Sequence, residues 1–290
     1  MAISPAHRFG QIIGELLEDA VRAVLTPFAR KHGLYLDQEG ERPCRSGTKK
    51  CTWTDLKKNK HDLDFVLERG GTPKRLGIPV AFIETAWRRY TKHSKNKAQE
   101  IQGAILPLVA TYPNAGPFIG AVLGGVFTST ALAQLRSLGF QVVYISYESI
   151  IAVLNAYGID AEYEENTPDA EFTKKIKRFE ALTGPRRARL VKELLNFHKK
   201  DVAAFTRSLE ATVSRQIERI IILPLHGAKT EVKTVPDAIA FIQRYDEAKC
   251  SAVIDRYEIQ VLYNNGNEIE GRFNDKQSAV DFLRTYHPLV

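Results

Sequence analysis

Residues 81–101, AFIETAWRRYTKHSKNKAQEI, join an apolar run to a strongly basic one. The segment 78–85, IPVAFIET, is apolar enough to predict a strand in the interior of a sheet. It carries one carboxylate, Glu84, near its C-terminal end. Five cations follow within thirteen residues: Arg88, Arg89, Lys92, Lys95 and Lys97. The sequence therefore predicts a buried strand whose end, with its acid, lies beside positive charge.

The segments around this strand alternate between helical and extended patterns. We expect helices at 8–33, 94–109, 128–139 and 147–158, and strands at 62–68, 78–85, 117–125 and 140–146. The order helix-strand-strand-helix-strand-helix-strand-helix predicts an α/β fold, with a mixed central sheet flanked by helices.

A composition change near 160–171, DAEYEENTPDAE, suggests a division into residues 1–165 and 166–290. The second part begins with charged helices over roughly 168–219. It ends in a segment with an internal repeat, because DAIAFIQRY at 237–245 resembles SAVDFLRTY at 278–286. With the strand-like pieces around them, and the hairpin signal NNG, these copies predict a small α+β module.

Charge and composition indicate which kinds of partner and cellular compartment suit this chain. The chain of 290 residues has a formal net charge of +7 and a pI near 9.2, which favours a polyanionic partner, nucleic acid first. Seven Lys or Arg residues stand in the polar loop 42–60, among them Lys49, Lys50, Lys57 and Lys58. Three cysteines without a C-x-x-C pair fit a reducing cytoplasm. YPNAGP interrupts the uncharged run 101–135, so we expect no membrane span.

Carboxylates on the two central strands could share a metal ion. Asp62 and Asp64 alternate on the predicted strand 62–68 and so point to one face. If this strand pairs with 78–85 as a hairpin, Asp64 and Glu84 can meet. Two carboxylates in one place form a site for a hard cation, and Mg²⁺ is the usual occupant beside phosphate. Arg88 and Arg89, next to such a site, could bind a phosphate backbone.

LDFVLE followed by VAFIETA, within this order of elements, resembles the PD-(D/E)xK nuclease superfamily, and within it the type II restriction endonucleases. The resemblance covers roughly residues 8–158. It implies that Asp64 is the first metal-binding acid, Glu84 the second, and Glu15 an acid on the first helix, with Asp62 as an alternative first acid. In some members a further acid stands on the helix after the site, which would make Glu100 a reserve ligand.

The chain departs from this family at Ala86, where a lysine is usual. Three explanations stay open: a cation that has moved to the next helix, as Lys92, Lys95 or Lys97; an inactivating substitution at position 86; or a site that binds DNA without cutting. The resemblance implies a Mg²⁺-dependent endonuclease that hydrolyses double-stranded DNA as a twofold homodimer. The alternatives are a structure-specific repair or recombination nuclease and a non-cleaving DNA-binding protein.

Overall fold

The computed structural model describes residues 4–286, except 46, 92–93, 114 and 250–254. The chain forms two compact units, residues 1–213 and 214–290. The boundary therefore lies after the charged helices and not at 165/166, where the acidic stretch led us to expect it. The three helices between residues 169 and 213 belong to the first unit because their apolar faces, including Phe172, Leu190 and Phe205, join its hydrophobic core.

The first unit is an α/β sandwich around a five-stranded sheet, as predicted. Its sheet strands are β1 (Leu34–Gln38), β4 (Phe65–Arg69), β5 (Ile78–Arg88), β6 (Phe118–Gly125) and β7 (Gln141–Ser146). Its helices are α1 (Pro5–Lys31), α2 (Ser94–Thr111), α3 (Ser129–Ser137), α4 (Tyr147–Ala156), α5 (Asp169–Glu180), α6 (Gly184–Phe197) and α7 (Lys199–Val213). A separate hairpin pairs β2 (Cys51–Thr54) with β3 (Lys60–Leu63).

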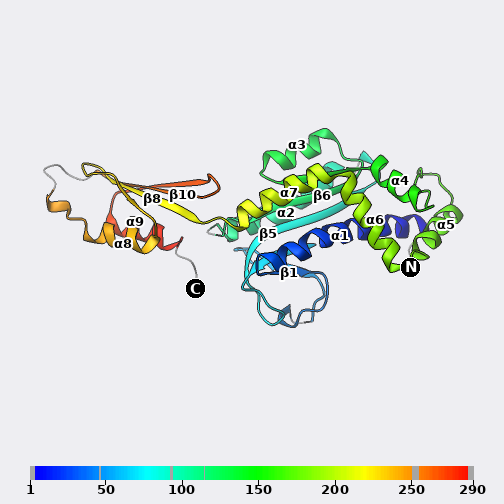
Figure 1. Cartoon of the computed structure of the whole chain (residues 1–290), viewed down its shortest axis with the longest axis horizontal. Helices are drawn as coiled ribbons and strands as arrows, with labels where there is room; N and C mark the ends of the chain where they lie inside the picture. The colour runs from blue at the N-terminus through cyan, green and yellow to red at the C-terminus, as the bar shows by residue number, and fades with distance from the viewer. Residues whose placement is uncertain (1–3, 46, 92–93, 114, 250–254, 287–290) are drawn as a thin grey trace. The chain divides into compact units, whose positions relative to one another are not determined.

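The sheet order is β1-β4-β5-β6-β7, with β5 in the centre. The β1–β4 and β4–β5 pairs are antiparallel, whereas β5–β6 and β6–β7 are parallel, so the sheet is mixed. One face packs against α1 and α4–α7, and the other against α2 and α3, in two separate apolar clusters. Figure 1 shows α1 running along β5.

Two details differ from the predicted elements. The expected strand 62–68 is broken at Asp64 into β3, which pairs with β2, and β4, which pairs with β5. The edge strand β1 was not predicted. At the far end of β5, the carbonyl of Arg88 accepts a hydrogen bond from Val126 at 2.7 Å. Gly125 allows this approach, since it has φ +98° and a Cβ there would lie 2.1 Å from the same oxygen.

The second unit repeats a β-β-α motif. Its sheet has the order β11-β10-β8-β9, formed by β8 (Ile217–Pro224), β9 (Thr230–Val232), β10 (Tyr257–Tyr263) and β11 (Glu268–Phe273). The helices α8 (Val235–Arg244) and α9 (Lys276–Arg284) complete the two copies. Thr234 and Asp275, 41 residues apart, cap their helices in the same way. The predicted repeat and small α+β module are therefore present.

Candidate functional site

The break at Asp64 opens the sheet. Phe65 pairs with Ile83, so the register continued by one residue sets Asp64 opposite Glu84. At this point the chain leaves β5 to form the β2–β3 hairpin, and the next amide of β5 has no strand to pair with on that side. The Asp64 carboxylate takes this place: its Oδ2 accepts hydrogen bonds from the Thr85 amide at 2.6 Å and the Thr85 hydroxyl at 2.7 Å.

Glu84 lies beside Asp64, as the hairpin register predicted. Its Oε1 accepts a hydrogen bond from the Asp64 amide at 3.2 Å, and the residue is only 6% exposed. Burial, and after it the charge of Asp64, raise the pKa of Glu84 to about 8, while Lys97 and the Asp64 amide oppose the shift. The ionised form of Glu84 has too little positive charge near it to offset the cost of burial. A bound cation would supply that charge.

The acid that α1 brings to this place is Glu18, not Glu15. Burial raises the pKa of Glu18 to about 7, and the charge of Asp64 is the next cause. Among the described residues Glu18 has no hydrogen-bond or ion-pair partner within contact distance. Glu15 is exposed and pairs instead with Arg8 at 2.7 Å. The resemblance implied Glu15, whereas the acid of α1 that lines the space beside Asp64 is Glu18, three residues later.

Glu18 and Asp64 line an open groove of about 360 Å³, whereas Glu84 is buried and is not among the lining residues. One wall is α1, the floor is the end of β5, and α2 contributes one cation. The groove is lined by His7, Gly10, Gln11, Gly14, Glu18, Asp64, Thr85, Ala86, Trp87, Arg88 and Lys97. Carboxylates, a lysine and an arginine thus meet in one solvent-accessible place, which suits an anionic substrate bound through a metal ion.

Of the lysines considered as substitutes at Ala86, Lys97 lines this groove. Its side chain is 21% exposed and its Nζ lies 3.3 Å from Glu100, which is itself exposed and also 3.9 Å from Arg88. Lys95 is exposed on α2 and is absent from the groove lining. Lys92 lies outside the described residues. Ala86 is buried in the core beneath α2 and reaches the groove wall.

The two arginines after β5 differ in their surroundings. Arg88 lines the groove and donates to the Trp87 carbonyl at 2.8 Å. Arg89 is 14% exposed and donates to the Tyr163 carbonyl at 2.8 and 3.1 Å, with its guanidinium 4.0 Å from the Tyr147 ring centre. These contacts fasten the segment after α4 to the end of β5. The geometry therefore favours Arg88, and not Arg89, as a phosphate contact.

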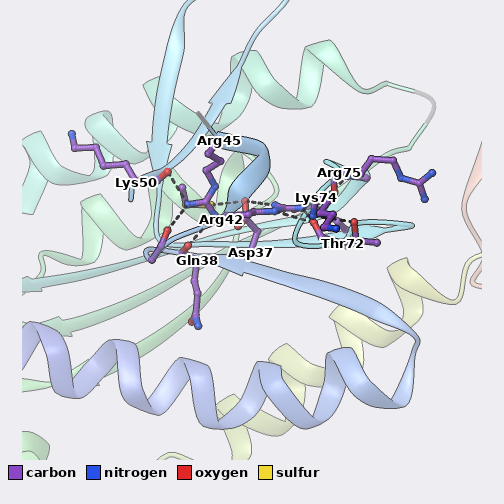
Figure 2. A network of polar contacts seen from close by, with 12 residues as sticks. Asp37, Gln38, Arg42, Arg45, Lys50, Thr72, Lys74 and Arg75 are labelled. Carbon is purple, nitrogen blue, oxygen red and sulfur yellow. Dashed lines mark hydrogen bonds and ion pairs between the residues drawn. The ribbon is translucent and has the colours of Figure 1, made fainter. Parts of the chain in front are cut away.

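The basic loop contains two kinds of cation. Arg42 and Arg45 are buried: Arg42 pairs with Glu68 at 2.5 and 3.0 Å and with Asp37 at 2.8 Å, and Arg45 pairs with Asp37 and donates to the Gln38 carbonyl at 2.9 Å. Figure 2 shows this network where the loop meets β1. These two residues hold the loop in place.

Five lysines of the loop are exposed: Lys49, Lys50, Lys57, Lys58 and Lys60. Lys50 binds Asp62 at 2.6 Å, and the Thr52 hydroxyl donates to the same carboxylate at 2.6 Å. Asp62 is therefore committed to the β2–β3 hairpin. It does not share a strand with Asp64, because the chain changes partner between them.

Within the described ranges, no group of three or more His, Cys, Asp or Glu side chains is close enough to hold a metal ion by itself. The site consists of the pair Asp64 and Glu84 with Glu18 nearby. Mg²⁺ usually keeps several waters and takes one or two carboxylates together with substrate phosphates, so this set fits that ion. In the part of the chain that the structure describes, no helix has the length and apolarity needed to cross a bilayer.

No family model and no curated protein matches this chain. Among solved structures, the chain is similar to one titled "Crystal Structure of Protein of Unknown Function AF1548", at 11% identity and a TM-score of 0.29. The alignment covers 65% of this chain and 99% of that one. A similarity at this level carries no argument about the fold or the activity of this chain.

Proposed function

We propose that this chain is a Mg²⁺-dependent endodeoxyribonuclease of the PD-(D/E)xK type, acting on double-stranded DNA in the manner of a restriction enzyme. The observation that carries the proposal is the contact between Asp64 and Glu84 at the point where β4 and β5 part, with Glu18 and Lys97 on the same groove. Asp64 and Glu84 would hold Mg²⁺, with Glu18 as a further acid. The bound ion would supply an activated water and charge neutralisation at the phosphate.

The other side chains of the groove have distinct roles in this proposal. Thr85 orients Asp64 through two hydrogen bonds. Lys97 replaces the lysine that the family carries at position 86, and stabilises negative charge that develops on the phosphate. Arg88, with the exposed lysines of the loop, would contact the DNA backbone and make binding salt-dependent. A twofold dimer would allow both strands to be cut.

Digestion of a plasmid with Mg²⁺, EDTA or Ca²⁺ in parallel tests this proposal. We expect discrete fragments with Mg²⁺ alone, and no cleavage by Asp64→Asn or Glu84→Gln. Asp62→Asn is the matched control, since Asp62 is a neighbouring carboxylate that is engaged elsewhere, and it should cut like the wild type. Cleavage that persists in EDTA, or equal activity in all three variants, would contradict the assignment. Cutting of branched DNA in preference to plasmid would favour the repair nuclease.

Ala86 favours a second candidate, a DNA-binding protein that does not cleave. The residue is 6% exposed at the position where the family has its lysine. Plasmid digestion by wild type and by Ala86→Lys separates the candidates. If cleavage requires the introduced lysine, Lys97 does not perform the missing role and the chain as it stands only binds DNA.

A further inference from the structure

The wall that α1 presents to the groove contains two glycines. His7, Gly10, Gln11, Gly14 and Glu18 follow one another at helical spacing, so they lie along one face of the helix. Glycine inside a helix lowers its stability relative to alanine. Two glycines on one face of a long helix therefore call for a reason, which must be either internal packing or an external partner.

Internal packing does not require them. A Cβ at Gly14 would meet nothing within 4 Å, and a Cβ at Gly10 would meet only Trp87, at ordinary contact distances of 3.8 and 3.9 Å. At Gly124 in β6, by contrast, a Cβ would lie 2.4 Å from Leu17, so that glycine is needed for packing. Gly14 instead leaves the backbone of α1 bare toward open space, and Gly10 leaves it bare beside the Trp87 indole.

A second observation is that charged residues border this space, among them Asp64, Arg88 and Lys97. Glu84 is more than nine-tenths buried, and in the described part of the chain its single hydrogen-bond donor is the Asp64 amide, which reaches Oε1. Glu84 is therefore joined to this space through Asp64, which lines it, and is not itself part of the lining. Lys97 and Arg88 border the same groove, so an anionic molecule can approach without net repulsion.

We propose that Gly10 and Gly14 form a bare helix wall against which the sugar–phosphate backbone of the bound DNA strand packs, next to Asp64 and Glu84. The absence of two side chains lets the strand approach the helix more closely than alanine or a larger residue would allow. His7 and Gln11, whose side-chain nitrogens lie 3.3 Å apart, border this wall and offer polar contacts to the same strand. This inference rests on the proposed function, because it states how that substrate is seated.

The test compares Gly14→Ala, Gly14→Leu and Gly10→Ala with Gly103→Ala and Gly103→Leu. Gly103 is an exposed glycine inside α2 where a Cβ would also meet nothing within 4 Å, and it is absent from the groove lining. Each alanine variant should raise the thermal midpoint by about 2–4 °C, since helix propensity improves at all three sites. These shifts also show that the alanine variants are folded, and a single thermal transition in the same measurement checks this for the two leucine variants.

Binding of a fluorescently labelled DNA duplex is then measured with Ca²⁺ in place of Mg²⁺. Gly14→Leu should weaken the affinity by about tenfold or more, equivalent to about 1.4 kcal/mol, whereas Gly103→Leu should bind like the wild type. If Gly14→Leu binds the duplex as tightly as the wild type does, the proposal of a bare helix wall is wrong, while the nuclease proposal still stands. A wild type that binds no duplex would overturn both.

Discussion

Asp64 and Thr85 are joined by two hydrogen bonds to the same carboxylate oxygen, one from the backbone amide and one from the side-chain hydroxyl. The hydrogen bond from the amide forms because β4 begins only after Asp64, so the Thr85 amide has no backbone partner in the sheet on that side. The hydrogen bond from the hydroxyl, by contrast, depends on which side chain stands at position 85. It fixes the direction in which the other oxygen of Asp64 points.

Thr85→Val tests whether this orientation matters for the chemistry. Valine keeps the shape of the threonine side chain and the hydrogen bond from the backbone amide, but it lacks the hydroxyl. We therefore expect the free energy of unfolding to fall by about 1 kcal/mol. The cleavage rate at saturating DNA should fall about tenfold, since misplaced ligands slow catalysis more than they weaken binding. Thr52→Val removes a similar hydroxyl bond, to Asp62. That control should cleave normally, and equal losses in both variants would argue against a special role for Thr85.

The pKa values of Glu84, about 8, and Glu18, about 7, make stability depend on pH. Both are raised from 4.5, so the folded protein binds more protons than the unfolded chain between these values. Stability contributed by the neutral carboxyls is complete below pH 4.5 and is lost as the pH rises through 7 and 8. We therefore expect the thermal midpoint in EDTA to decline over this range.

Glu84→Gln, which stays neutral, should flatten that decline. Mg²⁺ should raise the midpoint of the wild type more at pH 8 than near pH 5, because the ligands must lose their protons before they bind it. Asp62→Asn serves as control, since the pKa of Asp62 is lowered by Lys50 and Thr52 and its contribution runs in the opposite direction. A Mg²⁺ effect that is the same at both pH values would contradict a metal site at Glu84.

Lys97→Met asks whether the lysine has moved from position 86 to α2. Methionine keeps the length and the apolar stem and removes the charge. We expect cleavage to slow by about 100-fold or more, the cost of removing one group that stabilises transition-state charge, while duplex binding in Ca²⁺ changes little. Lys95→Met, on the same helix but outside the groove, is the control. If Lys97→Met cuts as fast as Lys95→Met, another group supplies the charge.

The sequence predicts those parts of the site whose contacts join residues close together in the chain, and it misses those that join distant segments. The pairing of Asp64 with Glu84 follows from a local hairpin, and it was predicted. The break at Asp64 was not, because it depends on β3 pairing with β2. Glu15 and Glu18 are both acids on a helix, and the choice between them depends on where α1 crosses β5, which no local pattern records.

Buried charges show the same limit. Arg42 and Arg45 belong to a run of basic residues that is typical of a solvated loop, and nothing nearby in the sequence marks them as different from Lys49. Their partner Asp37 stands on the edge strand that was missed, and Glu68 lies in a strand 26 residues from Arg42. Ionic contacts between distant segments are visible only once the sheet is assembled.

That network leads to a prediction about stability. Arg42→Met would leave Glu68 and part of Asp37 buried without their main counter-charge, and removing one partner of a buried ion pair costs about 3–5 kcal/mol. Lys49→Met removes an exposed pair with Glu41 and should change stability by about 0.5 kcal/mol or less. Urea unfolding followed by tryptophan fluorescence reports on the first unit, which contains both tryptophans, Trp53 and Trp87.

The double variant Arg42→Met with Glu68→Leu separates two causes of this loss. If the cost comes from an uncompensated charge, the double variant should be more stable than Arg42→Met alone, because Arg45 still pairs with Asp37 and no carboxylate remains at position 68. If the cost comes from the loop losing the bonds of Arg42 to the carbonyls of Thr72 and Arg75, both 2.9 Å, the second substitution should bring no recovery. We expect recovery, since Glu68 is fully buried and keeps only the Gly77 amide, at 2.5 Å, as a donor among the described residues once Arg42 is gone.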